Sequence, residues 1–434
     1  MAENHRETEQ ELDQTDMSIK HRDGIITVIL TADNHLGYNA LGQQPHKREE
    51  RQQRLQHAFQ QATDFAIMQG VDLFIQAGDL FDTTAPDERD RSFVADRLAQ
   101  LKQAGIKAFA LGGVHDTPIN PLSGAAVPAP QQSYARLGAL HYFSPTQHTA
   151  QQELEPVLLD IDEIRVGICA LGILAGQEDD PLAAVHVQSA LERAQIALLI
   201  LHAPIEGLAP SSSLLDSSAQ VSRKSIEQQT AFGIILAGYH HGYSRLKIGK
   251  TEVVVAGSTQ HIDFTVPDQA PGFVFMGIAA DGIRWCNHIS VDALRMQRLV
   301  IQTGDLWPSE NNQTSPTDSI LDRLRPLCAD DVMVQLRLEG ELTRSQYHQL
   351  NLNQIRHYGE DHCFALAIDD SALSFLPEQD VTVTETGERL SPREEIIALA
   401  NEWIAAASDE QEKQALQFTK EELLLAIDEM RSQY

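Results

Sequence analysis

Short apolar runs alternate with amphipathic helical patterns from residue 25 to about residue 280. Runs rich in β-branched residues are typical of buried strands, and apolar positions at helical spacing separate them. Leu55, Phe59 and Phe65 form the apolar face of a predicted helix between the first two runs, and Gly70 marks its end. The predicted strands are IITVIL (25–30), VDLFIQ (71–76), IKAFAL (106–111), IRVGICAL (164–171), IALLIL (196–201), FGIIL (232–236), EVVVA (252–256) and GFVFMG (272–277).

This alternation predicts an α/β fold whose sheet is covered on both faces. The length of 434 residues predicts two or three domains, each large enough to bury its own core. A second unit is expected at about 295–375, where VMVQLRLEG (332–340), a helical stretch after Thr343 and CFALAI (363–368) predict a small β-α-β domain. The polar segment 304–318 is predicted to be a loop or linker.

The segment 385–434 is predicted to be helical. Ser391, Pro392 and Glu394 make a capping box at the start of an apolar pattern. Thr419 and Glu422 make a second capping box. Such terminal amphipathic helices either dock on their own domain or form an arm for another protein.

Composition places the chain among globular proteins, with 42% hydrophobic and 22% charged residues. No apolar run approaches the roughly 20 residues that span a bilayer. Residues 1–24 are polar and acidic, so we expect a disordered tail and no signal peptide. The four cysteines lie far apart, which argues against a disulfide framework and a thiolate zinc site and favours the cytoplasm.

The net charge of −29 bears on any contact with nucleic acid. A protein that binds DNA alone usually carries a basic stripe, whereas the basic residues here form separate clusters. These clusters are either solvated faces or local phosphate contacts. If nucleic acid is the substrate, we expect a partner to supply much of the attraction for phosphate. The clusters are Lys47, Arg48, Arg51 and Arg54; Arg223 and Lys224; and Arg245, Lys247 and Lys250.

Side chains that bind metals follow five of the predicted strands, at the end where α/β sheets hold ligands. Buried carboxylates and imidazoles without a cation would be costly, and this mixed set suits Mn²⁺, Fe or Zn²⁺. One carboxylate shared between two ions about 3.5–4 Å apart would bind both the attacking and the leaving oxygen of a phosphodiester. The segments are TADNHLG (31–37), AGDLFD (77–82), GGVHD (112–116), LHAPIEG (201–207) and AGYHHGY (237–243).

The segments TADNHLGY and AGDLFDTTAP resemble the first two motifs of the calcineurin-like metallophosphoesterases. More narrowly, they resemble the SbcD family of DNA repair exonucleases, bacterial relatives of the meiotic recombination nuclease. HAPIEG and VVAGSTQHIDF match later motifs in order. The resemblance implies a metallophosphoesterase two-sheet sandwich flanked by helices at 25–290, a small α/β (α+β) cap domain at 295–375, and C-terminal partner-docking helices at 385–434.

The resemblance also implies a role for each matching residue. Asp33, His35 and His241 would bind a first metal ion. Asp79 would bridge the two ions, and His202 would bind the second.

The predicted site departs from the family beside its catalytic histidine. His115 matches the family's His that orients or protonates the scissile phosphate and leaving group. Val114 and Tyr239 stand where the family has an Asn and a His that bind the second metal. Val114 cannot act as a ligand, Tyr239 could do so only with a phenol pKa lowered from ~10, and His240 is a possible substitute. We expect one tightly bound ion, Mn²⁺ first with Fe, Zn²⁺ or Mg²⁺ as alternatives, and a second that is weak or absent.

Three functions remain open from the sequence. The first is a metal-dependent phosphodiesterase, an exo- or endonuclease acting on DNA ends in repair or defence. The second is a weakened or inactive SbcD-like scaffold that binds DNA ends without cutting them. The third is a small-nucleotide phosphodiesterase. For the first two, the resemblance implies DNA, an SbcC-type coiled-coil ATPase and a second copy of the chain as partners, with no membrane. The few basic residues at 295–375 argue against a DNA-binding role for the cap.

Overall fold

A computed structural model describes residues 24–376, apart from the gaps and later positions given at the end of this paragraph. The tail predicted for 1–24 and the helices predicted for 385–434 therefore lie outside the described residues, except for Gly24 and single helical positions. Contacts divide the chain into Met1–Leu342 with Gln346–Phe375, and Thr343–Ser345 with Leu376–Tyr434. The gaps are 39–44, 120–126, 146–151, 175–178, 184, 209–218, 267 and 308–314, and the positions described after 376 are 400, 404, 413, 416, 417, 419 and 420.

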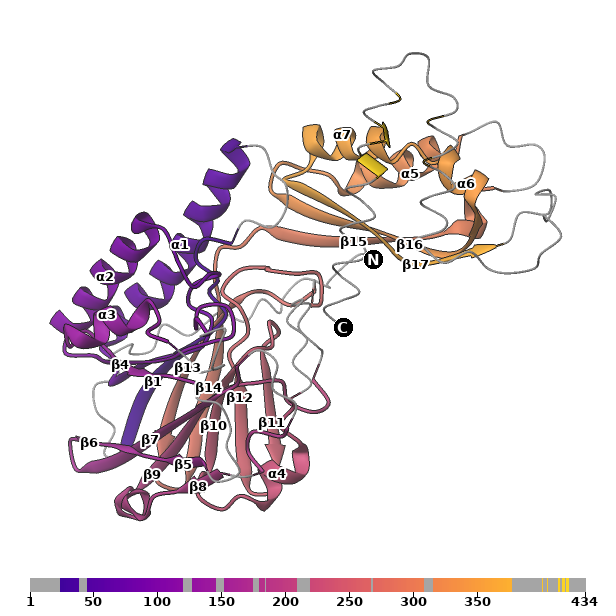
Figure 1. Ribbon diagram of the computed structural model, residues 1–434. Helices are drawn as coiled ribbons and strands as arrows, with labels where there is room; N and C mark the ends of the chain where they lie inside the picture. The colour runs from indigo at the N-terminus through magenta and orange to yellow at the C-terminus, as the bar shows by residue number, and fades with distance from the viewer. Residues whose placement is uncertain are drawn as a thin grey trace, which may run out of the picture. The chain divides into compact units, whose positions relative to one another are not determined.

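The first sheet has the strand order β14-β13-β1-β2-β3-β4 (Figure 1). Strands β1 to β4 are parallel, and β13 and β14 add an antiparallel hairpin beside β1. Parallel pairing brings the carboxyl ends of β1, β2 and β3 to one edge of the sheet. The strands are β1 (Ile25–Thr31), β2 (Leu73–Ala77), β3 (Lys107–Leu111), β4 (His141–Phe143), β13 (Gly272–Ala279) and β14 (Gly282–Ser290).

The second sheet has the order β11-β12-β10-β9-β7-β6. Its central strands β12, β10, β9 and β7 are parallel, and both edge strands are antiparallel to their neighbours. The strands are β6 (Val157–Ile161), β7 (Ile164–Gly172), β9 (Ile196–His202), β10 (Ile234–Gly238), β11 (Ser244–Ile248) and β12 (Thr251–Val255). A separate small ladder pairs β5 (Gln152–Leu154) with β8 (Val185–Val187).

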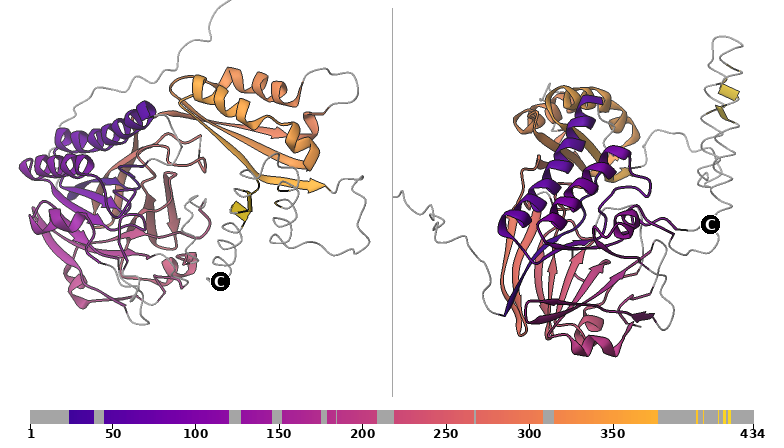
Figure 2. Two further views of the ribbon diagram at one scale, coloured as in Figure 1. Left: turned by 45° about the horizontal axis from the view of Figure 1, so that its top comes forward. Right: turned by 90° about the vertical axis from the view of Figure 1, so that its left-hand side faces the viewer.

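Three apolar layers hold these sheets together. The inner layer contains Val28, Ile75, Leu198 and Leu236, so it lies between the sheets, where burial of apolar side chains stabilises the fold. A second layer packs the helices against the outer face of the first sheet, and α1 and α2 lie side by side there (Figure 2). A third covers the outer face of the second sheet. The helical segments are α1 (Pro45–Gln69), α2 (Glu88–Gln103), α3 (Gln131–Arg136), η1 (Ser189–Arg193) and α4 (Arg223–Gln228).

The predicted two-sheet α/β fold is therefore confirmed, and each predicted strand forms one. The helix predicted from Leu55 to Phe65 is α1, and Gly70 follows it at φ 60°. Left-handed backbone of this kind is easily reached only by glycine, which explains why the helix ends there.

The segment after residue 294 forms a three-stranded sheet in the order β15-β16-β17, with helices on one face (Figure 1). Its buried residues, such as Ile301, Val334, Leu336 and Ile355, form their own apolar cluster. The elements are β15 (Arg295–Gln302), η2 (Thr303–Asp305), α5 (Pro316–Leu324), η3 (Arg325–Leu327), β16 (Val332–Thr343), α6 (Arg344–Gln349), α7 (Leu352–His362) and β17 (Ala365–Leu376).

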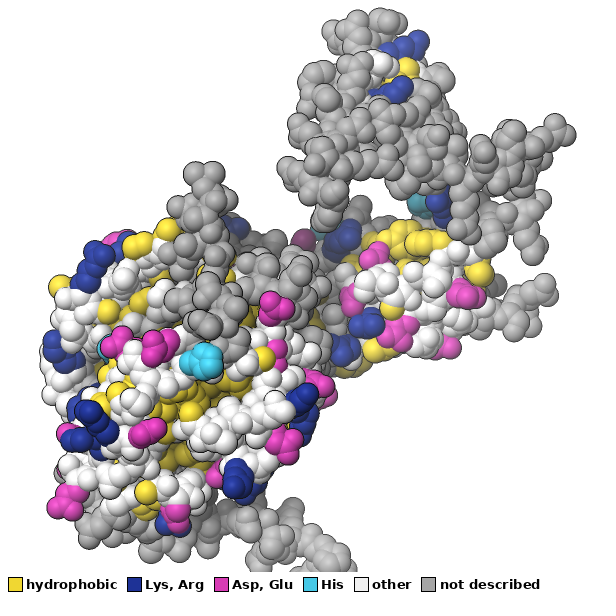
Figure 3. Space-filling view, turned by 60° about the horizontal axis from the view of Figure 1, so that its bottom comes forward, with side chains coloured by type: hydrophobic (Ala, Val, Ile, Leu, Met, Phe, Trp, Pro, Cys, Tyr) yellow, Lys and Arg dark blue, Asp and Glu magenta, His cyan; other side chains and the backbone are white. Residues whose placement is uncertain are grey.

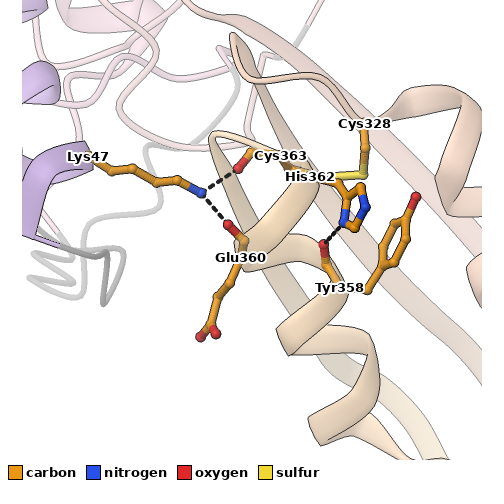
Figure 4. Close-up of a disulfide and its surroundings, with 6 residues drawn as sticks. All are labelled: Lys47, Cys328, Tyr358, Glu360, His362 and Cys363. Atoms are coloured by element: carbon orange, nitrogen blue, oxygen red, sulfur yellow. Dashed lines mark hydrogen bonds between the residues drawn. A yellow bond between two sulfur atoms is a disulfide. The ribbon is translucent and has the colours of Figure 1, made fainter.

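A disulfide joins Cys328 to Cys363, 35 positions apart, in this segment (Figure 4). The expectation from cysteine spacing was wrong for this pair, because folding brings the end of α7 beside the residue that follows η3. Lys47 of α1 donates hydrogen bonds to the carbonyl oxygens of Glu360 and Cys363. Cys169 and Cys286 are free thiols.

The basic clusters differ in their surroundings. On the face shown in Figure 3, Lys and Arg side chains lie scattered among acidic and uncharged ones. Arg51 is not part of a solvated face, because its side chain is only 1% exposed. No helix in the described part of the chain is both long and apolar enough to cross a membrane.

Candidate metal centre

The strand-end side chains converge where the two sheets meet. Asp33 and His35 follow β1, Asp79 follows β2, and His115 follows β3. The second sheet contributes His202, the last residue of β9, and His241, which follows β10. An isolated bridge between Ala32 and Ser258 joins the loop after β1 to the loop after β12.

The loops turn sharply at the residues that face the centre. Asp33, His35 and Asp79 have φ values of 47°, 44° and 52°. Asp and His enter this left-handed region more readily than most residues, although at some cost. Backbone hydrogen bonds from Asp33 N to Gly78 O (3.0 Å) and from His35 N to Asp79 O (3.1 Å) hold the two loops together. The strained backbone therefore aims these side chains at one point.

Glycines allow the loops to approach this closely. A Cβ on Gly113 would lie 2.1 Å from Asp79 Oδ1, and one on Gly78 would lie 2.0 Å from His202 Nδ1. Neither position has room for any side chain.

Three overlapping groups of these residues could hold a metal ion. Within each group the ligand atoms lie within 4.8 Å of one another. Asp33 and Asp79 each belong to two groups, as does His35, so the groups form one connected set. The groups are Asp33, His35 and His241; His35, Asp79 and His115; and Asp33, Asp79 and His202.

Hydrogen bonds donated by Nδ1 orient three of the histidines. His202 Nδ1 donates to Ala77 O at 2.8 Å, and this carbonyl can only accept, so the proton is on Nδ1. His35 Nδ1 lies 2.9 Å from Asp82 Oδ1, and His241 Nδ1 lies 2.7 Å from Asp263 Oδ2. In each neutral ring Nε2 then keeps its lone pair. Partners of this kind orient metal-ligating histidines and increase their basicity.

The residues fit a divalent cation. Among the described residues, Nε2 of His35 and Nε2 of His202 are buried and have no hydrogen-bond partner. His202 Nε2 lies 3.2 Å from Asp79 Oδ2, but not in hydrogen-bond geometry. Buried nitrogens without partners are costly, and a cation would satisfy both of them. Imidazole and carboxylate donors together suit Mn²⁺, Fe or Zn²⁺.

Burial and neighbouring charges shift the pKa values in the centre. Burial raises the pKa of Asp33 to about 6. Burial alone would lower the pKa of His202, but attraction to Asp79 outweighs it and raises the pKa to about 9. Burial likewise opposes the charged form of Asp79, yet attraction to His202 and His35 leaves its pKa below the usual range. The centre thus contains several interacting titratable groups, and a bound cation would shift their pKa values again.

Asp116 organises the loops and does not face the centre. Its carboxylate accepts N–H groups from Leu80 (2.8 Å), Phe81 (3.2 Å) and Gly113 (2.8 Å), and also a hydrogen bond from Gln131. Burial raises its pKa to about 6.

The second side of the centre is partly apolar. Val114 packs against the third apolar layer, and so does the ring of Tyr239. The Tyr239 ring centroid lies 5.6 Å from that of His202, and its backbone N–H donates to Asp33 Oδ2 at 3.0 Å. His240 Nε2 accepts the Ile205 N–H at 2.8 Å. His240 is not in the three ligand groups found among the described residues.

Sequence reasoning missed the two acids that orient the histidines and the buried arginine near them. Asp82 was visible in AGDLFD, and Asp263 in the quoted HIDF segment, but neither was given a role. Both are acids in loops that follow strands at the same edge as the ligand residues, and this position is the signal that could have identified them.

Parts of the chain are similar in sequence to known proteins. Residues 26–219 match the family described as Calcineurin-like phosphoesterase. The DNA double-strand break repair protein Mre11 of Thermoplasma acidophilum is 36% identical over 87 residues, 20% of this chain and 22% of that protein. The chain thus spans about a fifth of that relative. Mre11 of Halobacterium salinarum is 26% identical over 314 residues, 72% of this chain and 70% of that protein. The crystal structure of TT1561 from Thermus thermophilus has a TM-score of 0.34 and 12% identity, covering 61% of this chain and 99% of that one.

Proposed function

Because residues 26–219 match the family described as Calcineurin-like phosphoesterase, we propose that the chain is an SbcD-like, divalent-metal-dependent DNA nuclease subunit. Its substrate would be the phosphodiester of DNA ends, in repair or defence. The named relatives are DNA double-strand break repair proteins, which supports DNA over a small nucleotide as the substrate.

One observation carries the metal-dependent part of this proposal. Three groups of buried acids and histidines share residues at one strand-end cluster, and His35, His202 and His241 each use Nδ1 elsewhere. This leaves Nε2 of each ring as the ligand atom. Mn²⁺ is the ion we expect first, with Fe, Zn²⁺ and Mg²⁺ as alternatives.

In this proposal the residues of the centre have different roles in metal and substrate binding. Asp33, His35 and His241 hold the tightly bound ion, and Asp79 and His202 face the second position. When bound, the ion supplies Lewis-acid polarisation of a phosphoryl oxygen and an activated water. His115 is a quarter exposed, so it can reach a substrate. Burial lowers the pKa of His115, so its neutral ring can orient the phosphate by donating one N–H.

A second function is favoured by the apolar residues at the second position. Val114 offers no ligand atom, and a site with one ion would cleave a phosphodiester poorly if two ions are needed. The chain would then be a scaffold that binds DNA ends without cutting them.

A metal and nuclease assay on the full chain tests both functions. We expect about one Mn²⁺ per chain to bind tightly, with a second only at high concentration. Cleavage of blunt, hairpin or single-stranded DNA in Mn²⁺ that is lost in His115→Gln supports the nuclease. Tight Mn²⁺ binding with DNA binding but no cleavage supports the scaffold. Two ions at full occupancy would contradict the assignment of Val114 and Tyr239.

The partners belong to the same proposal. An SbcC-type coiled-coil ATPase would supply the DNA attraction that a chain of net charge −29 lacks, and a second copy would complete the assembly. The candidate docking arm is 385–434. Deleting it should abolish co-purification with such an ATPase and leave Mn²⁺ binding intact; unchanged co-purification would refute the arm.

A further inference from the structure

A buried arginine lies beside the candidate metal centre and has no part in the ligand set. Arg51 of α1 is 1% exposed and is among the largest fully buried side chains of the described residues. Its Nη2 donates to the carbonyl oxygen of His261, and its Nη1 lies 3.5 Å from Gln260 Oε1. Its Cζ lies 5.7 Å from the centroid of the Tyr38 ring, within cation–π range.

Burial of this cation is expensive. Among the described residues, no carboxylate forms an ion pair with Arg51, and its Nε has no hydrogen-bond partner. Burial lowers its pKa to about 10, so the guanidinium is still charged at neutral pH. An apolar side chain of similar volume often stabilises a core at least as well as a buried charge. The position of Arg51 therefore calls for a role other than packing.

The contacts of Arg51 lead to the first ligand group from two directions. His261 is two residues before Asp263, whose Oδ2 accepts from His241 Nδ1 at 2.7 Å. On the other side, the Tyr38 backbone N–H donates to His35 O at 2.9 Å, and the two rings lie 6.4 Å apart edge to face. Arg51 thus contacts the loop that carries His35 and the loop that carries Asp263, the partner of His241.

We propose that Arg51 is a positioning residue for the first metal ion: it fixes the 260–263 loop so that Asp263 holds the His241 ring with Nε2 toward the ion. The inference rests on the proposed function, because it assumes that Asp33, His35 and His241 bind an ion. Arg51 is too buried to touch DNA, so its effect would pass only through these loops.

Mn²⁺ titration of the full chain tests this role by calorimetry, with Arg51→Met and the neighbouring control Arg54→Met. Arg54 lies on the same helix and pairs with Glu50 at the surface. We expect R51M to weaken the tight Mn²⁺ site about tenfold, the lower range for residues that orient metal ligands, and R54M to leave it unchanged. Arg51→Lys should lose less, about threefold, because one ammonium donor can still reach the His261 carbonyl.

A double-mutant cycle with Asp263→Asn separates positioning from general destabilisation. If Arg51 acts through Asp263, R51M should cost less than twofold in the D263N background. An equal tenfold loss in both backgrounds, or unchanged affinity in R51M, overturns the proposal. If R51M does not fold, the same cycle with R51K decides: a threefold loss that disappears in D263N supports the role, and an unchanged affinity refutes it. Absence of tight Mn²⁺ binding in the unmutated chain would refute the proposed function instead.

Discussion

The two sides of the candidate metal centre use the same kind of strand ends but are completed differently. On the first side, Asp33, His35 and His241 lie together, and Asp82 and Asp263 orient two of the rings. On the second side, His202 and Asp79 form a group with Asp33. The Tyr239 ring centroid lies 5.6 Å from that of His202, and Val114 and Tyr239 pack against an apolar layer.

We propose that a centre of this kind can keep its shape while one of its two metal positions loses ligands. The second side retains an oriented histidine, because His202 Nδ1 donates to Ala77 O. Its three-residue group includes Asp33, which the proposed function assigns to the first ion, so Asp79 and His202 remain as donors for a second ion. The number and charge of the ligands tune the affinity of a site for its metal. We therefore expect the two sides to separate clearly in metal titrations.

The largest effect should come from the first side. Asp33→Ala removes a carboxylate shared by two ligand groups, so tight Mn²⁺ binding should weaken by at least about 100-fold, beyond the range for residues that only orient ligands. Asp281→Asn, an exposed acid paired with Arg284, is the matched control and should bind normally. Metal analysis after gel filtration measures both. Equal metal content in D33A and the unmutated chain would mean that the ion binds elsewhere.

Restoring ligands should strengthen the second side. Val114→Asn with Tyr239→His adds two donors, so the second Mn²⁺ should bind at least about tenfold more tightly, since even residues that only orient ligands change affinity ~10–100-fold. Val114→Ile with Tyr239→Phe keeps the volume without donors and should change nothing. Calorimetric titration gives both affinities. No gain in the restored variant would argue that backbone position, and not side-chain chemistry, limits the second ion.

The affinity for the second ion should rise with pH. On the first side, Asp33, with its pKa raised to about 6 by burial, is already ionised at pH 7, so this carboxylate should contribute less than twofold to any gain from pH 7 to 9. Burial alone would lower the pKa of His35, but the hydrogen bond to Asp82 and nearby acids outweigh it and raise this pKa, so the His35 ring must also lose a proton. His202, raised to about 9 against burial by Asp79, must lose a proton before it binds metal. The second ion should therefore gain about tenfold over this range, because the first ion already offsets part of the Asp79 charge. A second-ion affinity that stays constant from pH 7 to 9 would contradict the assignment of His202.

The smallest effect on the tight ion is expected from a substitution confined to the second side. His202→Gln removes a ligand of the second side only, so the tight ion should weaken by less than about threefold. This is well below the ~10–100-fold cost of disturbing a ligand's own partner. Calorimetry at low Mn²⁺ concentration measures it, with His141→Gln, an exposed histidine of β4, as the control. A loss as large as that in D33A would show that one ion spans both sides.

Sequence patterns predicted the buried strands and missed the exposed ones. Central strands such as β9 are continuous apolar runs, whereas the edge strand β11 (SRLKI) and the half-exposed β14 (GIRWCNHIS) mix polar and apolar residues. Edge strands need to bury only part of their surface, so their sequences carry a weak signal. The pairing of Cys328 with Cys363 was also hidden, because it depends on where α7 ends in space.

The sequence predicted the acids and histidines that converge at the strand ends, but not the residues that act through another side chain. Asp33, His35, Asp79, His202 and His241 stand out because acids and histidines rarely follow buried strands without a reason. Asp263 and Arg51 do not stand out, since a surface ion pair would look the same in sequence. Only the three-dimensional structure shows that Arg51 is buried and that Asp263 contacts His241.

Asp116 anchors the loops after β2 and β3 through three backbone N–H groups and Gln131, all of them groups of the protein itself. A chelator that removes a bound ion should therefore leave the conformation of these loops unchanged. Because these hydrogen bonds do not involve the ligand residues, single ligands could be replaced during evolution without loss of the fold. Activity could then be lost, or regained, by few substitutions.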